Sequence, residues 1–426
     1  APVAPGARTL GFRDFVVLWG DLGVGLLVLF AGSLLVPALG LPQAVAAIVV
    51  GSLVGVTLLA LAGVPSSRAG VPTMVALRGV LGVRGSWIPT GLNVVQLLGW
   101  TVFELAIMGY AANAASRSLL GWDAYPFWLA VFAALVIALG VWGPLAVVRR
   151  FLGRFAVWIM LATSAYLTWT IFARYDVAAL WAAPGRGGFP GFWSGVDLVI
   201  AMPISWMPLV GDYSRLARRP ADAAWGTALG YLAANVWFYT LGALVLLAAG
   251  VVPEPRSFVE GVMLLAGPLA LVVLVVDETD EAWADLYSCA VSLQNLAPAV
   301  SQRGVILGLG VLAFAVALVL DVTRYESFLL LVGSVFVPLF GVLFADVYLL
   351  GRRYDARTLF TTGPGAGVRG PAVAAWLAGV VAYHWLAGGL AFLGLPGAPW
   401  LGASLPSLAV AAAAHAALGR RVAVVD

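Results

Sequence analysis

Charged side chains are scarce in this chain of 426 residues. Only 10% of the residues are Asp, Glu, Lys or Arg, and lysine is absent, so all 23 basic residues are arginine. Hydrophobic residues make up 62% of the chain, and the mean hydropathy is +1.00. A soluble globular protein carries about 25% charged residues. The composition therefore excludes a soluble globular protein and predicts an all-α protein that crosses a membrane many times.

Cysteine and histidine are almost missing as well. The lone Cys289 excludes an intramolecular disulfide. His384 and His415 lack the spacing of metal ligands, so we expect them to pack inside the protein or lie at the membrane interface. No basic surface interleaved with aromatic residues is present, which argues against a nucleic-acid partner. Membrane lipid is the expected surrounding, and nothing in the chain indicates an obligate protein partner.

Long apolar stretches predict twelve membrane spans. They are residues 15–39, 42–64, 88–116, 126–145, 152–173, 193–214, 223–250, 258–296, 304–320, 327–350, 372–393 and 399–418. With the N-terminus in the cytoplasm, 18 of the 23 arginines fall on the inside, and the five outside are Arg117, Arg174, Arg186, Arg256 and Arg324. The positive-inside rule thus predicts a plasma (inner) membrane protein with both termini in the cytoplasm.

Two of the predicted spans are interrupted. The first contains WGDLGVG at residues 19–25, with three glycines and an acid, and the sixth contains MPISWMP at residues 202–208, with two prolines. Breaks five spans apart are typical of two inverted five-helix repeats with a binding site between them. The predicted organisation is a cytoplasmic N-terminus, two repeats, a cytoplasmic connector, two accessory spans and a cytoplasmic C-terminus. These parts are residues 1–14, 15–173, 174–350, 351–371, 372–418 and 419–426.

Five acidic residues lie inside the eighth span, where ionised groups are costly. At helical spacing, three of them stack on one face and a fourth lies beside that face. The nearest arginines along the chain are at least 18 residues away, about 27 Å along a helix. Protons, a metal cation or a cationic substrate must therefore balance these charges, unless the helix ends near Val276 and the acids form a solvated loop. The acids are Asp277, Glu278, Asp280, Glu281 and Asp285.

Four further stretches carry a family resemblance. They are GVRGSWIP at 82–89, WTVFE at 100–104, DYSR at 212–215 and VPLFG through DVY at 337–348. Over spans one to ten, the chain resembles the nucleobase:cation symporter family, which includes a hydantoin transporter and cytosine permeases. The resemblance implies the leucine-transporter fold, with two inverted five-helix repeats, two C-terminal helices and alternating access. Within the family, ISWMPL at 204–209 and the acidic eighth span look most like hydroxymethylpyrimidine transporters, which import a thiamine precursor.

The third span carries the first pair of candidate substrate residues. Trp100 and Glu104 are four residues apart and share a helix face. The resemblance implies that Trp100 is an aromatic platform and that Glu104 reads the edge of a heterocycle. The hydantoin transporter has an amide at the Glu104 position. A carboxylate there favours an aminopyrimidine, because it can accept hydrogen bonds from the N–H groups of that ring. The alternative is a packing tryptophan with Glu104 ion-paired elsewhere.

The resemblance implies four more substrate contacts. Trp206 is a candidate second aromatic wall, although the family's spacing to Asp212 lands on Pro203 instead. Asp285 matches a substrate-contacting amide of the family, and Glu281 matches a polar position one turn earlier. Gly25, at the end of the interruption in the first span, completes the predicted substrate site.

A cation site is implied in the same way. Thr279 and Asp280 match paired hydroxyl residues that help to ligate sodium, and the remaining ligands would be the carbonyl oxygens of Asp21, Val24 and Val276. Unwound helices free such carbonyls, and oxygen ligands suit a hard cation. Because Asp280 is a carboxylate where the family has a hydroxyl, both Na⁺ and H⁺ remain open as the coupling ion.

Import of a small pyrimidine, specifically hydroxymethylpyrimidine, by cation symport is the favoured function. An importer of cytosine, allantoin or another nucleobase-like ring is the alternative from the same family. A membrane-embedded enzyme is disfavoured, because the chain has no histidine-rich metal motif and no recognisable activated nucleophile. No organic cofactor is expected.

Overall fold

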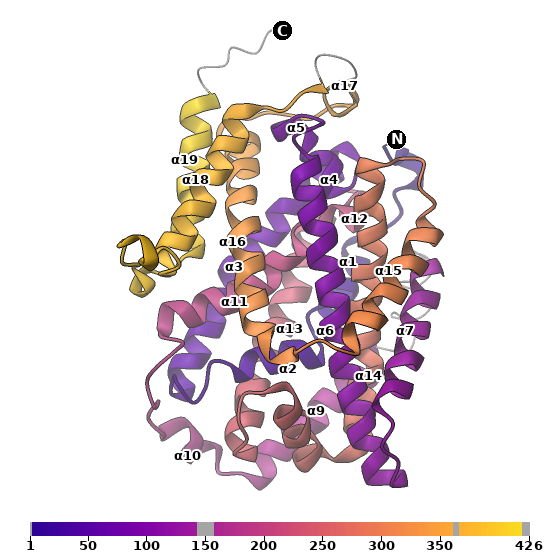
Figure 1. Ribbon diagram of the computed structural model, residues 1–426, viewed down its shortest axis with the longest axis vertical. Coiled ribbons are helices and arrows are strands. Elements are labelled where there is room, and N and C mark those ends of the chain that lie inside the picture. Colours follow the sequence, from indigo (N-terminus) through magenta and orange to yellow (C-terminus); the bar gives the residue numbers. More distant parts are fainter. Residues whose placement is uncertain (1, 143–156, 361–365, 420–426) are drawn as a thin grey trace.

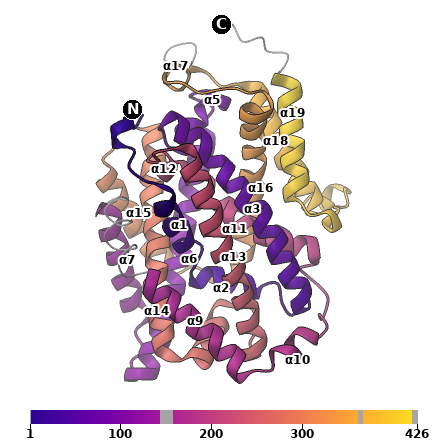
Figure 2. The same ribbon diagram turned by 180° about the vertical axis from the view of Figure 1, so that it is seen from behind.

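The computed structural model describes residues 2–142, 157–360 and 366–419, almost all of them in helices or short connections (Figure 1). No strand occurs in these three ranges, and their one isolated bridge pairs Leu10 with Ala217. The long helices form one bundle, with α18 and α19 along its side in both views (Figures 1 and 2). The predicted all-α class is confirmed.

The helices alternate long membrane-length segments with short pieces. In chain order they are η1 (Pro5–Ala7), α1 (Phe12–Asp21), α2 (Leu26–Ser33), α3 (Leu41–Ala69), α4 (Thr73–Ala76), α5 (Arg78–Leu81), α6 (Trp87–Leu120), α7 (Tyr125–Trp142), α9 (Val157–Arg174), α10 (Val177–Ala182), α11 (Phe192–Trp206), α12 (Val210–Ser214), α13 (Pro220–Ala249), α14 (Pro255–Leu296), α15 (Gln302–Ala317), η3 (Val322–Arg324), α16 (Tyr325–Phe344), η4 (Ala345–Leu349), α17 (Ala356–Leu359), α18 (Gly370–Leu386), η6 (Ala391–Leu393), η7 (Pro399–Leu401) and α19 (Ser404–Gly419).

Both interruptions foreseen in the sequence are present. The first span divides into α1 and α2, whose axes are bent by 60°. The sixth divides into α11 and α12, with the break after Trp206. Pro203 lies inside α11, so this helix continues one turn beyond its first proline. Each break leaves backbone groups without helical partners at the middle of the bundle, where a ligand can use them.

The number of spans stays a prediction. Within the described ranges, six helices are long and apolar enough to cross a membrane, or seven if α1 and α2 count as one span. The helices α11, α15, α18 and α19 are apolar but only 10–17 residues long. The arginine-rich segment between α7 and α9, with Arg149, Arg150 and Arg154, and the C-terminal residues 420–426 lie outside the described residues.

The eighth predicted span, residues 258–296, is not one straight helix. At Gly267 the backbone has φ +80° and ψ 173°, and Pro268 follows, so α14 is two helices joined at a kink. Only glycine adopts this region readily, and the proline removes a backbone donor. The kink separates an outer segment, residues 255–266, from the inner segment, residues 268–296, that carries the acids. The acids are therefore helical, and the solvated-loop alternative is wrong.

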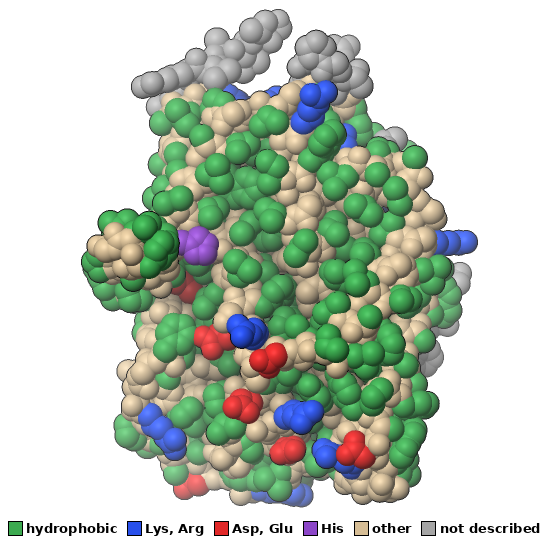
Figure 3. Space-filling view, in the orientation of Figure 1, with side chains coloured by type: hydrophobic (Ala, Val, Ile, Leu, Met, Phe, Trp, Pro, Cys, Tyr) green, Lys and Arg blue, Asp and Glu red, His purple; other side chains and the backbone are tan. Residues whose placement is uncertain are grey.

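Equivalent helices of the two repeats pack against each other. The helix α3 lies along α13, and α6 lies along α14, so the polar face of α6 meets the acidic face of α14 inside the bundle. Hydrophobic side chains cover most of the face shown in Figure 3, while charged side chains gather toward its lower end. Exposed examples include Val95 at 67% and Val381 at 58%. Such an apolar belt is the surface that lipid covers.

Candidate functional site

The central site is built where α6 faces the inner segment of α14. Trp100 and Glu104 from α6 are 5% and 1% exposed, and Glu281 and Asp285 from α14 are 4% and 2% exposed. Glu278, one turn before Glu281, is fully buried. The predicted substrate residues of both helices therefore point into the protein, as the cost of charge in lipid requires, whereas Val276, a predicted cation ligand through its carbonyl oxygen, is 46% exposed. The side chain of Asp277 lies outside the described residues.

An aromatic wall surrounds the ring of Trp100. The indole packs edge-on against Tyr325 and Phe328, with ring centroids 5.7 and 5.3 Å apart, and Phe103 contacts the same two rings. Trp100 Nε1 is buried and donates no hydrogen bond to any described residue. Sequence reasoning missed Tyr325 and Phe328, which come from the start of α16. Their spacing of three residues on an apolar helix could not identify the helix that they would face.

Glu104 has no basic partner. Its Oε2 is buried without a hydrogen bond to a described residue, and its carboxyl group lies near enough to Asp285 and Glu278 for mutual repulsion. Within the described ranges, Glu104, Glu278 and Asp285 form no ion pair with an arginine. The alternative in which Glu104 is ion-paired elsewhere is therefore wrong for the described residues. Buried carboxyl groups in such proximity need protons or a cation between them.

Glu278 caps the second half of the broken first span. Its carboxylate accepts hydrogen bonds from the backbone N–H of Leu26 and of Leu27, the latter at 3.3 Å. These are among the donors that a helix N-terminus leaves without partners, and the carboxylate also meets the positive end of the helix dipole. Sequence reasoning placed Glu278 beside the acidic face without a role, and only the fold shows that it faces α2.

Gly25 lies against two of these carboxyl groups. A Cβ atom at this position would come within 2.7 Å of Glu281 Oε1 and 2.8 Å of Glu278 Oε2. The backbone at Gly25 is extended, so the requirement for glycine here is one of space. The structure thus brings Gly25 and Glu281, both predicted from the sequence, into direct contact.

Trp206 belongs to a second aromatic cluster. Its ring lies edge-on to Trp19, with centroids 6.0 Å apart, and Trp19 also contacts Tyr213 and Tyr231. Pro203, the other position considered, packs against α3 at Gly55. Among the ring contacts of the described residues, Trp206 and Trp100 belong to separate clusters. Trp206 therefore lines the α1 side of the bundle centre, and Trp100 lines the α16 side.

The predicted cation site brings two acids together. The side chains of Asp21 and Asp280 are within hydrogen-bonding reach of each other, and they are 1% and 2% exposed. The Thr279 hydroxyl donates to the carbonyl oxygen of Val276 at 2.6 Å. Val24 lies in the break, where its N–H donates to the carbonyl oxygen of Asp21 at 3.0 Å. Two carboxyl groups in contact share a proton or hold a cation.

The donor set is one of oxygen atoms. Within the described ranges, no three His, Cys, Asp or Glu side chains are arranged to hold a metal ion. Asp21, Thr279 and Asp280 at the junction of α1 and α14 offer oxygen atoms, and hard cations prefer oxygen ligands.

A buried polar network follows the same face of α6 toward α5. Gln96 donates to the Ser205 carbonyl and to Asn93, and Asn93 donates to Ser292 on α14. The network links α6, α11 and α14 by hydrogen bonds of 2.8–3.0 Å. Sequence reasoning missed it, although the spacing of three to four residues from Asn93 to Glu104 could have indicated one polar face.

A second set of bonds closes the network at α5. The guanidinium of Arg78 donates to the side chain and carbonyl of Asn295, and the Asn295 amide donates to Ser86 and Thr90. Burial lowers the pKa of Arg78 from its usual value. These contacts tie the short helix α5 to the end of α14 and seal that end of the bundle with matched polar groups.

Most of the chain matches a known protein family. The profile of a family described as "Permease for cytosine/purines, uracil, thiamine, allantoin" matches residues 2–398. The hydantoin permease of Microbacterium maritypicum is 26% identical over 378 residues, which are 83% of this chain and 76% of that protein.

Solved structures show the same fold. The nucleobase-cation-symport-1 family transporter Mhp1, in a closed conformation with bromovinylhydantoin bound, superposes with a TM-score of 0.83 at 22% identity, over 99% of this chain and 94% of that one. A Na⁺-coupled sialic acid symporter superposes with a TM-score of 0.61 at 11% identity, over 97% and 90% of the two chains. The fold is that of the leucine-transporter class, as the sequence resemblance implied.

Proposed function

Because the chain belongs to the family of permeases for cytosine/purines, uracil, thiamine and allantoin, we propose that it imports hydroxymethylpyrimidine, a small aminopyrimidine, by cation symport. The observation that carries the proposal is the pairing of Trp100 with Glu104 on one buried face, opposite Asp285. As a member of this family the chain is a membrane transporter of nucleobase-like compounds. The choice of an aminopyrimidine as the substrate is our proposal.

The chemistry of the site favours an aminopyrimidine. The indole of Trp100 offers a flat face or edge to the ring, and its free Nε1–H can donate to a ring nitrogen. Glu104 as a carboxylate accepts hydrogen bonds from an exocyclic amine, and Asp285 provides a second acceptor. An imide such as hydantoin presents carbonyl oxygens, which a carboxylate cannot satisfy. The carboxylates therefore select for donors on the substrate.

Coupling uses the break in the first span. The carbonyl oxygens of Asp21 and Val24, with Thr279 and Asp280 on α14, would hold a sodium ion between α1 and α14. The same Asp21–Asp280 pair can instead carry a proton. The solved structures with a similar fold include a Na⁺-coupled symporter, which supports sodium as the coupling ion. Either cation would draw α1 and α14 together beside the substrate.

Alternating access follows from the same arrangement. The broken helices α1–α2 and α11–α12 form the moving element, while α6 and α14 carry most of the substrate contacts. In the closed arrangement described here, Trp100, Glu104, Trp206, Glu281 and Asp285 are each at most 5% exposed. Movement at the α6–α11 contact, where Gln96 donates to Ser205, would open the site toward one side.

Ligand binding to the purified protein tests the proposal. Tryptophan fluorescence is followed while hydroxymethylpyrimidine or cytosine is added, in sodium buffer and in choline buffer, across a range of pH. We expect tighter binding of hydroxymethylpyrimidine than of cytosine, and tighter binding in sodium than in choline. Trp100 and Trp206 report on this site, and their change in emission is measured against the background of the other 15 of the 17 tryptophans.

The other outcomes separate the alternatives. Equal or tighter binding of cytosine would make the protein a cytosine-type permease, because that ring lacks the hydroxymethyl and methyl groups that a larger pocket contacts. Binding that ignores sodium but follows pH would assign the coupling to protons. Failure of both rings to bind would remove the pyrimidine proposal and leave the family membership in place.

A further inference from the structure

A second cavity lies far from the central site, at the end of the bundle where α5, η4, α18 and α19 meet. Its volume is about 580 Å³, and residues from the segment between η4 and α17 also line it. Four basic side chains line the cavity, and none of its described lining residues is acidic. The basic residues are Arg352, Arg353, Arg369 and His415.

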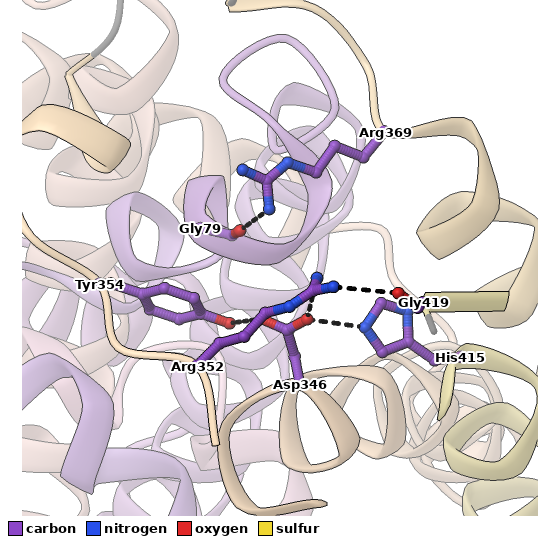
Figure 4. Close-up of polar contacts among 7 residues, drawn as sticks. All are labelled: Gly79, Asp346, Arg352, Tyr354, Arg369, His415 and Gly419. Carbon is purple, nitrogen blue, oxygen red and sulfur yellow. Dashed lines mark hydrogen bonds and ion pairs between the residues drawn. The ribbon is translucent and has the colours of Figure 1, made fainter. Parts of the chain in front are cut away.

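One arginine in this cavity is already neutralised. Asp346 is fully buried beneath it and accepts hydrogen bonds from Arg352 at 2.9 Å, Tyr354 at 2.7 Å and His415 Nε2 at 2.8 Å (Figure 4). Burial, reinforced by the neighbouring Asp346, raises the pKa of Tyr354 well above its usual value, so its hydroxyl remains a donor. Asp346 therefore fixes Arg352 and His415 in place and offsets a single positive charge.

Two further arginines at the cavity form no ion pair with a described acidic side chain, so their positive charges are available to a ligand. Arg353 is exposed, and its guanidinium makes no hydrogen bond or ion pair with any described residue. Arg369 is held at the cavity by a hydrogen bond from its guanidinium to the carbonyl oxygen of Gly79, which leaves other donors of the group available (Figure 4). The cavity thus has an excess of positive charge, and the guanidinium of Arg369 is held in position there.

The start of α18 adds to this field. Arg369 is the N-cap of this 17-residue helix and provides no side-chain cap, and the first residues of the helix line the cavity. The helix dipole favours an anion at such an end, while the N–H groups of Ala372 and Val373 already donate to the carbonyl oxygen of Arg369. His415 lines the same cavity, is 3% exposed, and is held by its hydrogen bond to Asp346.

The rest of the lining is apolar. Val80, Val368, Pro371 and Ala372 contribute to the wall, and Val368 is 53% exposed. The cavity is lined in part by α18 and α19, and these helices lie along the side of the bundle in both ribbon views, where lipid covers the protein (Figures 1 and 2). A free phosphate ion needs only the charges, whereas a lipid headgroup uses the charges and the apolar wall together.

We propose that this cavity binds the phosphate headgroup of an anionic phospholipid. Arg353 and Arg369 contact the phosphate, and the glycerol and upper acyl chains lie against the apolar wall. Because the lining comes from α5, the segment that follows η4, α18 and α19, the lipid joins the accessory helices to the end of the tenth span.

Binding of short-chain lipids to the purified full chain in neutral detergent tests this proposal. The probes are dioctanoyl phosphatidylglycerol, dioctanoyl phosphatidylcholine and inorganic phosphate, and the readout is the melting temperature from tryptophan fluorescence as each probe is titrated. We expect phosphatidylglycerol to bind the tightest. Removing one arginine charge near a lipid headgroup is expected to weaken binding about fivefold, so Arg353→Gln should do so and Arg353→Gln with Arg369→Gln should weaken it about 25-fold.

Arg303→Gln is the matched control, because this arginine is exposed and belongs to α15 rather than to the cavity. Its affinity for phosphatidylglycerol should equal that of the unmodified protein. Arg353→Gln keeps the test valid if the double variant folds poorly, since Arg353 makes no bond to the described residues. Equal binding of phosphatidylcholine and phosphatidylglycerol, or unchanged affinity in Arg353→Gln, would overturn the site. Inorganic phosphate binding as tightly as phosphatidylglycerol would overturn the lipid assignment in favour of a soluble anion.

Discussion

Single carboxyl groups define what the central site can bind. Glu104 and Asp285 are buried side by side without an arginine, an arrangement that costs free energy in the absence of a ligand, proton or cation. A protein keeps such groups where they meet a partner that arrives from outside. In this chain we expect that partner to be a substrate whose exocyclic amine donates hydrogen bonds to the carboxyl groups.

Neutral amides at these positions should therefore stop transport. We expect Glu104→Gln and Asp285→Asn each to abolish uptake of labelled substrate while the protein still folds, because an amide keeps the size of the side chain and loses the charge. Uptake in cells, together with the yield and melting temperature of the purified variants, measures both effects. Glu260→Gln, an exposed acid on the outer segment of α14, is the control and should transport normally. Normal uptake by both site variants would contradict the assignment.

Space is equally restricted at Gly25. We expect Gly25→Ala to reduce substrate affinity at least tenfold, because its methyl group would displace the carboxyl groups of Glu281 and Glu278. The measurement is the same fluorescence titration. Gly91→Ala in α6 is the matched control, since nothing lies within 4 Å of its added Cβ, and it should bind substrate as before. Unchanged affinity in Gly25→Ala would show that these carboxyl groups do not shape the pocket.

At the scale of secondary structure elements, the broken first span depends on a cap from another helix. The N-terminus of α2 has no side-chain cap of its own, and the carboxylate of Glu278 on α14 takes this role. Because α1 and α2 are bent by 60°, the backbone donors at the break would otherwise be buried without partners. The position of α2 is thus tied to α14.

Removal of this cap should lower stability. We expect Glu278→Ala to cost about 1–3 kcal/mol of unfolding free energy, the usual penalty for leaving buried donors unpaired. Glu278→Gln should cost less, because its amide oxygen can still accept one of the two hydrogen bonds. Melting temperatures of the two variants in the same detergent provide the comparison. Equal melting temperatures for Glu278→Ala and the unmodified protein would mean that Glu278 does not hold α2.

At the scale of the whole molecule, two helices far apart in the sequence meet at the predicted cation site. Asp21 ends α1 in the first repeat, and Asp280 lies in α14 of the second. A cation or proton between them links the repeats, so its binding and release can bias the relative position of the moving and fixed elements.

The identity of the coupling ion should follow the charge at this junction. We expect Asp280→Ser, which restores the hydroxyl implied by the family resemblance, to remove any dependence of uptake on pH and to leave or strengthen dependence on sodium. Uptake measured at several sodium concentrations and pH values checks this. Thr279→Ser, which keeps the hydroxyl, is the control and should behave as the unmodified protein. Persistent pH dependence in Asp280→Ser would place the proton carrier elsewhere.

Properties that depend on local composition could be predicted from the sequence. Apolar length predicts helices, because a backbone in lipid must satisfy its own hydrogen bonds, and Gly-rich or Pro-containing segments predict the breaks at 19–25 and near Trp206. Acidic residues on one face of a membrane helix predict that this face points into the protein, because lipid cannot solvate charged side chains. The all-α class, the interrupted helices and the burial of Glu104 and Asp285 all follow from these local rules.

The partners of each side chain were decided only by the tertiary structure. Glu278 and Leu26 are 252 residues apart, and their hydrogen bond exists because α14 packs beside the break between α1 and α2. The contacts of Trp100 with Tyr325, and of Asp346 with His415, likewise depend on which helices become neighbours. Residue type and spacing along one helix determine which face is polar, but the meeting of two faces depends on the packing of the whole bundle, which no local pattern encodes.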